Sequence, residues 1–230
     1  MTETVITVQG RDVARHAAER AVVRLGVSFD GPARDAVFTD ASTAAESLRG
    51  AIESLHDSSA GPITTWSSDS IQVWSDRPWN QDGKQLPLVY HARIGFTAEF
   101  DDFDALSRFL ERQAAADGVA ISWVEWKLTD ERKDAATTEV RARAVADATR
   151  KAQTYADAIG LTRVRAIAIA DPGMLGDQSS ASGGGFEFAA AAPRMMKASM
   201  DSAASPELSL KPEEIEVAAV VDARFVASAG

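Results

Sequence analysis

The chain has 230 residues, of which 45% are hydrophobic and 25% charged, so its composition is that of an ordinary globular protein able to bury a core. Its 34 acidic and 24 basic residues give a formal net charge of -10, which repels phosphate backbones, and nucleic acid is therefore not an expected partner. There is no cysteine, which excludes disulfides, thiolate nucleophiles and thiolate metal sites.

The first ten residues alternate polar and β-branched side chains and lack both the basic and the apolar region of a signal peptide. No apolar run in the chain approaches the roughly 20 residues that span a bilayer. We therefore expect no transmembrane segment and a cytoplasmic location. A periplasmic or secreted location is expected instead if a leader has been removed.

Hydrophobic periodicity predicts the secondary structure in chain order. Alternation of apolar and polar residues predicts strands at 4–8, 17–29, 63–74, 88–100, 119–128, 161–170 and 215–226. Apolar residues at helical spacing predict helices at 36–55, from 103 to a stop at Gly118, and at 131–159. Asp101 and Asp102 stand where the N-cap and first-turn acid of the second helix belong.

This order of elements predicts an α+β fold with two parts. Residues 11–130 read as β-α-β followed by β-α-β, the split βαβ or ferredoxin-like order, in which helices cover an antiparallel or mixed sheet. Residues 1–10 and 131–230 are expected to form a smaller unit from the N-terminal strand, a long alanine-rich helix and the C-terminal strands.

The smaller unit contains a segment, 172–212, that is rich in glycine, serine and alanine. Such a composition buries too little apolar surface to offset the entropy of ordering, so we predict a flexible loop. The loop nevertheless carries adaptable apolar side chains that could contact a partner, namely Phe186, Phe188, Met195 and Met196.

No residue pattern in the chain predicts a catalytic, cofactor-binding or metal site. The three histidines, His16, His56 and His91, are far apart and lack the paired spacing of zinc ligands. The glycines at 183–185 are not followed by the Lys-Ser/Thr of a phosphate-binding loop, and there is no Gly-x-Ser-x-Gly motif. The acidic pairs at 101–102 and 213–214 are better explained as a helix cap and a solvated strand end.

The five tryptophans and two tyrosines make tryptophan the notable aromatic residue. Trp66 and Trp74 share strand parity and are expected on one face of a single strand. One interpretation of the set is core filling. The other places Trp74, Arg77 and Trp79 in an exposed recognition loop or subunit contact, where tryptophan and arginine are favoured.

The long helix carries two stripes. One consists of small apolar residues and is expected to pack closely on a sheet, namely Ala136, Val140, Ala144, Ala148, Ala152, Ala156 and Ile159. The other consists of charged residues at four-residue steps. Glu139, Arg143, Asp147 and Lys151 alternate in sign along it. A solvated face is the favoured interpretation, and a seam between subunits is the alternative.

Several local sequences together resemble the SIMPL domain family, a bacterial and eukaryotic group of largely unassigned biochemical activity that includes periplasmic immunogenic-protein-like members. The segments that carry the resemblance are 6–10, 22–27, 63–73, 90–92, 144–152, 155–156 and 160–161. The resemblance implies an α+β fold, self-assembly into larger oligomers and no established catalytic residues. Many relatives look secreted or periplasmic, a location that the absence of a leader in this chain does not match.

These observations lead to two functional hypotheses. The first is a non-enzymatic scaffold or interaction module that self-associates as a homo-oligomer, with any further protein partner unknown. The second is a small-ligand or peptide binding protein in which the 172–212 segment acts as a lid. An enzyme is not expected, and no cofactor is implied.

Overall fold

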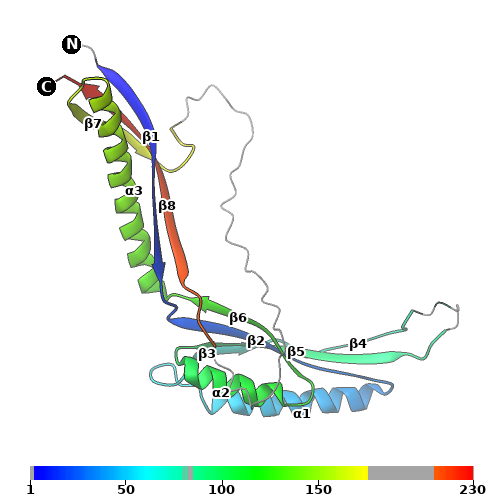
Figure 1. Ribbon diagram of the computed structural model, residues 1–230. Helices are drawn as coiled ribbons and strands as arrows, with labels where there is room; N and C mark the ends of the chain where they lie inside the picture. The colour runs from blue at the N-terminus through cyan, green and yellow to red at the C-terminus, as the bar shows by residue number, and fades with distance from the viewer. Residues whose placement is uncertain (1–2, 80, 82–84, 176–209, 230) are drawn as a thin grey trace, which may run out of the picture. The chain divides into compact units, whose positions relative to one another are not determined.

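The computed structural model describes residues 3–79, 81, 85–175 and 210–229. Three helices and antiparallel strand pairs make up this part of the chain, which confirms the predicted α+β class (Figure 1). In chain order the elements are β1 (Thr4–His16), β2 (Arg20–Gly31), α1 (Arg34–Glu53), β3 (Ile63–Ser68), β4 (Gln72–Asp76), β5 (Val89–Phe100), α2 (Phe103–Ala114), β6 (Val119–Lys127), α3 (Asp130–Ala158), β7 (Arg163–Ala170) and β8 (Ile215–Ser228).

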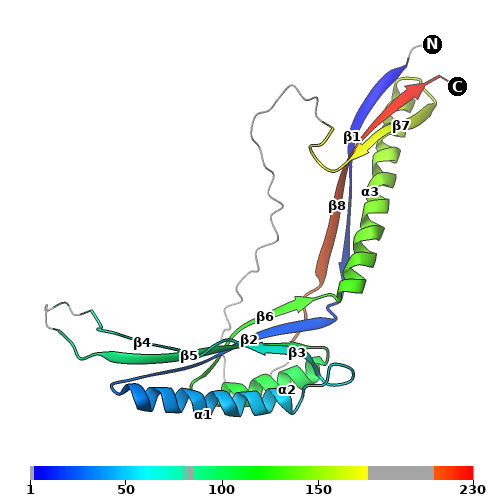
Figure 2. The ribbon, with the colours of Figure 1, turned by 180° about the vertical axis from the view of Figure 1, so that it is seen from behind.

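The chain divides into two compact units. Unit 1 consists of residues 1–15, 130–206 and 216–230, and unit 2 consists of residues 16–129 and 207–215. Each unit has a sheet and a hydrophobic core of its own. The elements of each unit can be followed from both sides in Figures 1 and 2.

Unit 2 is built on a five-stranded sheet in the order β3-β5-β2-β6, with β4 also paired to β5. The pairs β2–β5, β2–β6, β3–β5 and β4–β5 are antiparallel. Strand β5 lies between the two strands that α1 connects, and β2 lies between the two that α2 connects. Both helices cover the same face of the sheet, where alternate residues of β2 and β5 form the core (Figures 1 and 2).

The helices of unit 2 form where apolar spacing and capping favour them. In α1 the buried residues recur every three or four positions, at Val37, Ala41, Ala45, Leu48 and Ile52. Helix α2 begins after Asp102, whose carboxylate accepts hydrogen bonds at 2.9 Å from the backbone amides of Asp104 and Ala105. Asp102 is therefore the N-cap residue of this helix.

Unit 1 pairs a three-stranded sheet, β1-β8-β7, with the single long helix α3. The helix buries a residue at every fourth position against the sheet, at Ala136, Val140, Ala144, Ala148, Ala152 and Ala156. These small side chains let α3 approach β1 closely at Gly10, where an added Cβ would lie 2.0 Å from the backbone oxygen of Ala144. The alanine stripe and this glycine together set the spacing between helix and sheet.

Two predicted strands differ from the observed ones. Strand β1 runs to His16, well beyond the predicted end at residue 8. The predicted strand at 63–74 is divided into β3 and β4, and Asp69 lies in the break. There the Asp69 amide still donates to the Gly95 oxygen at 2.9 Å, and its carboxylate lies against Gly95, where an added Cβ would be 2.4 Å from Oδ2. The Asp69 carboxylate can take this position because Gly95 has no side chain.

Candidate interaction surface

The candidate surface is a hairpin of unit 2, formed by β4, the first half of β5 and residues 77–88 between them. We call this hairpin the arm; residues 80 and 82–84 of it lie outside the described part of the chain. The β4–β5 ladder is regular from the Gln72–Arg93 pair to the Asp76–Val89 pair. Both views in Figures 1 and 2 show the two strands side by side.

The arm carries the three residues predicted as a recognition loop. The exposed fraction is 46% for Trp74 and 81% for Trp79. Arg77 donates from Nη1 to the Leu86 oxygen at 2.8 Å, which joins the two sides of the arm. The structure therefore places these three residues on one hairpin. The remaining members of the predicted surface, Phe186, Phe188, Met195 and Met196, lie outside the described residues.

An apolar groove lies where the arm passes the end of β2, and one of its lining residues, Pro78, directly precedes Trp79. Its volume is about 410 Å³, and its lining consists of Asp30, Gly31, Pro32, Pro78, Leu86, Pro87, Leu88 and Val89. One wall therefore comes from the end of β2 and the other from the arm itself. Apart from the Asp30 carboxylate, the side chains that line the groove are apolar.

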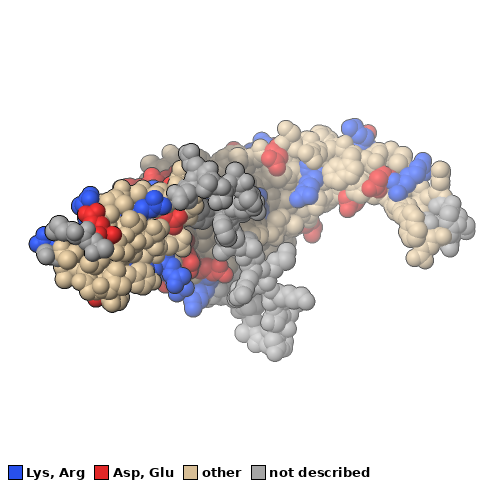
Figure 3. Space-filling view, turned by 90° about the horizontal axis from the view of Figure 1, so that it is seen from above, with Lys and Arg blue, Asp and Glu red and all other residues tan. Residues whose placement is uncertain are grey.

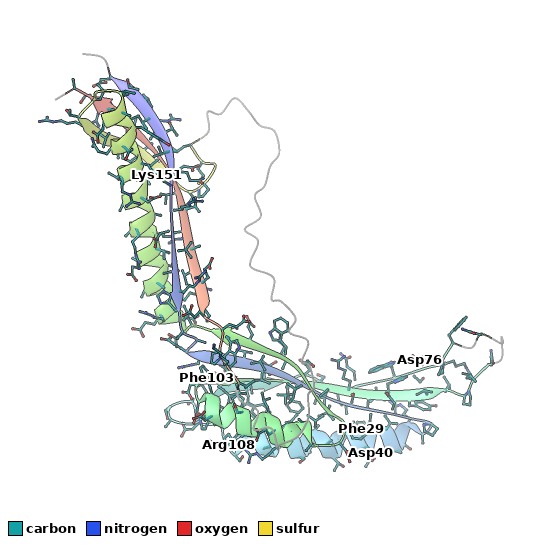
Figure 4. All side chains as sticks on the ribbon, in the orientation of Figure 1. Phe29, Asp40, Asp76, Phe103, Arg108 and Lys151 are labelled. Carbon is teal, nitrogen blue, oxygen red and sulfur yellow. The ribbon has the colours of Figure 1, made fainter. Side chains whose placement is uncertain are left out.

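A charged cluster stands next to this groove. The Nδ1 of His91 lies 2.6 Å from Oδ1 of Asp30, and its Nε2 lies 3.4 Å from Oδ1 of Asp76. Its ring also stacks on Trp74, with ring centroids 5.1 Å apart and planes inclined by 18°. Asp30 and Trp74 stand directly opposite His91 on the neighbouring strands, and Figure 4 labels Asp76 on β4. The imidazole thus contacts both strands that flank β5.

The surroundings of His91 favour its protonated form. The hydrogen bond to Asp30 raises the pKa of His91, and the weaker bond to Asp76 acts in the same direction. Partial burial, which leaves 19% of the side chain exposed, lowers the pKa and offsets part of this effect. When protonated, the ring can donate to both carboxylates at once.

The family comparison adds a finding that covers nearly the whole chain. A family model described as SIMPL, protein of unknown function (DUF541), matches residues 6–225. The chain belongs to the SIMPL family. The resemblance predicted from the sequence is thereby confirmed, and the family description supplies no activity. No curated protein matches the chain.

The other residues considered as catalytic or metal-binding in this SIMPL chain stand apart from the arm. His56 lies next to the end of α1, with Nδ1 3.0 Å from the Ile63 oxygen, and His16 ends β1. Within the described ranges, no group of three or more His, Asp or Glu side chains is placed to hold a metal ion. The described helices include none that is both long and apolar enough to cross a membrane.

The charged stripe of α3 faces β1 and is not a simple solvated surface. Lys151 donates from Nζ to the Gln9 oxygen at 2.9 Å and pairs with Asp147 at 2.7 Å. Asp147, with 13% of its side chain exposed, accepts from the Arg11 amide at 3.1 Å. These bonds lower the pKa of Asp147, with Lys151 as the main cause. We call this contact, from Gln9 and Arg11 to Asp147 and Lys151, the β1–α3 seam (Figure 4 labels Lys151).

The tryptophans divide between core and surface, and one of the predicted orientations is wrong. Trp66 pairs with Ala98 and packs on the core, whereas Trp74 pairs with His91 on the opposite face, because the break after β3 changes the parity of the strand. Trp126 packs edge-on against Phe103, and Trp123 of the same strand is exposed. Only part of the set therefore fills the core.

Proposed function

We propose that this SIMPL-family chain is a non-enzymatic interaction module that self-associates through its arm. The observation that supports the proposal is the position of Trp79, which is 81% exposed and directly follows Pro78, a lining residue of the apolar groove. A protruding side chain and a hollow on one surface allow a twofold contact, in which each copy places its tryptophan in the groove of the other.

The chemistry of the arm supports this contact. Tryptophan and arginine are enriched among the residues that dominate binding energy at protein interfaces. The groove volume of about 410 Å³ falls within the range of roughly 300–1,000 Å³ typical of ligand sites, which is large enough for an indole ring. On the face shown in Figure 3, acidic and basic residues are interspersed, so the net negative charge is not gathered there into one repulsive patch.

The test compares two exposed tryptophans of unit 2. Light scattering and sedimentation of the full chain across micromolar concentrations should show reversible self-association, weakened about tenfold or more by Trp79→Ala, which is ~1.4 kcal/mol or more. The matched control is Trp123→Ala, which removes an exposed tryptophan from β6 and should leave association unchanged. A wild-type chain that stays monomeric, or equal losses in both variants, would contradict the proposal.

The groove also favours a second candidate function, a peptide or small-ligand binding protein. Its lining is largely apolar with one carboxylate, Asp30, which suits an apolar group that carries a positive charge. A thermal-shift screen with apolar amines and short basic peptides, performed on Trp79→Ala, would detect such binding without competition from a second copy. A uniformly negative screen would remove this alternative.

A further inference from the structure

The groove has two walls, and His91 joins them. Asp30, which receives the shorter His91 bond, is also a lining residue of the groove on the β2 side. Asp76, which receives the longer bond, ends β4 two positions before Pro78, a lining residue on the arm side. The imidazole therefore connects the β2 wall to the arm wall.

The bridge requires two N–H donors, and imidazole has two only when it is protonated. A neutral ring donates from one nitrogen and presents a lone pair at the other, so one carboxylate would then face a lone pair. Asp30 and Asp76 would also repel each other across the uncharged ring. Loss of one proton thus removes one of the two imidazole hydrogen bonds between the walls, which then remain joined by the backbone ladders of β5.

We propose that His91 is a pH-sensitive clamp at the base of the arm, which holds β4 and the groove walls more tightly when it is protonated and loosens them when it is neutral. Its consequence for assembly rests on the proposed self-association. Trp74 of β4 is stacked on the His91 ring, so a change in the charge of the ring also affects this contact with β4.

The charged groups around His91 set the direction of the effect. Asp30 faces it from β2 and Asp76 from β4, while Arg93, two residues along β5, shares its face of the sheet. The two carboxylates favour the imidazolium, and accordingly the pKa of His91 is raised. The clamp is therefore closed below the folded-state pKa of His91 and opens as the pH rises through it.

The direct test measures the arm in a chain that cannot assemble. Hydrogen exchange at the β4 amides, corrected for intrinsic exchange, is followed from about pH 5.5 to 8.5, the range in which histidine titrates, in the full chain carrying Trp79→Ala. We expect β4 protection to fall severalfold as the pH rises. Adding His91→Gln should remove this pH dependence, whereas the control His56→Gln should retain it. Asp76→Asn, which keeps the histidine and the shape of the site, should reduce its amplitude.

Light scattering over the same pH range, on chains that retain Trp79, separates this proposal from the proposed function. Association that weakens with rising pH in the wild type but not in His91→Gln supports both. If β4 protection changes but no association occurs at any pH, the clamp is supported and self-association is not. Protection that is independent of pH, or that changes equally in the presence and absence of His91→Gln, overturns the clamp.

Discussion

Two strands at sheet edges, β1 in unit 1 and β4 in unit 2, are held in place by different means. In β1 the backbone itself is bonded, because Lys151 and Asp147 of α3 satisfy the Gln9 oxygen and the Arg11 amide. In β4 the polar attachment beyond the backbone ladder runs through Trp74 and Asp76 to His91, while Val73 packs on the other face against Val37, Ala41 and Ala92.

The two attachments differ in the side chain that carries the positive charge, which is a lysine at β1 and a histidine at β4. Lysine, with an ordinary pKa near 10.4, stays protonated throughout the physiological range, whereas histidine, ordinarily near 6.5, titrates within it. The comparison therefore predicts that the β1–α3 seam keeps its charges throughout the physiological range, whereas the base of the arm, under the proposed clamp, does not. Each prediction below tests one side of this contrast.

The largest effect is expected at Gly10. Gly10→Ala places a Cβ 2.0 Å from the Ala144 oxygen and 2.7 Å from the Ala148 nitrogen, both backbone atoms that cannot turn aside. Chemical denaturation should show a loss of about 3 kcal/mol in the free energy of unfolding, at the upper end of the overpacking range. A variant as stable as the wild type would show that α3 does not rest on β1 at this point.

A smaller loss is expected when the seam loses its lysine. Lys151→Met keeps the approximate length of the side chain but removes both the hydrogen bond to the Gln9 oxygen and the ion pair with Asp147, a combined loss of about 1–2 kcal/mol. Denaturation melts should show this loss, and hydrogen exchange should show weaker protection at the Arg11 amide. Lys133→Met, on the first turns of the same helix, is the control, and an equal effect there would contradict the seam.

The pH dependence of the seam should differ in sign from that of the clamp. Because the pKa of Asp147 is lowered in the folded chain, its stabilising contribution is present above its ordinary value of 3.8 and is lost as the pH falls through the folded-state value. The free energy of unfolding should therefore decline less steeply with acid in Asp147→Asn than in the wild type. Parallel acid profiles would refute this assignment.

The smallest effect is expected at a glycine outside both edges. Gly50 is in α1, and nothing lies within 4 Å of the position of an added Cβ. Gly50→Ala should raise the free energy of unfolding by about 0.5–1 kcal/mol, because alanine loses less conformational freedom in a helix. A thermal melt measures this gain. A loss of stability would indicate that the fold of unit 2 requires glycine at position 50.

The sequence predicted the positions of the helices and strands better than it predicted which residues contact each other between them. Helical spacing in α3 identified both its alanine stripe and its charged stripe, but the bonding partners of Asp147 and Lys151 are backbone atoms of β1, which carry no sequence signal. Similarly, His91 and Asp30 are 61 positions apart, and only the register of β2 on β5 brings them together. The prediction for Trp74 failed because the alternation of residues 63–74 does not reveal the break between β3 and β4, where the Asp69 carboxylate occupies space left open by Gly95 of β5.

The strand order of unit 1 constrains the order in which the two units can fold during synthesis. Strand β8 is the middle strand of β1-β8-β7 and comes last in the chain, so β1 and β7 acquire their common neighbour only when residues 215–228 leave the ribosome. Residues 16–129, by contrast, form most of unit 2 in one uninterrupted stretch and emerge long before. Since domains generally fold as units during synthesis, unit 2 would fold first, while the apolar faces of β1 and α3 await the arrival of β8.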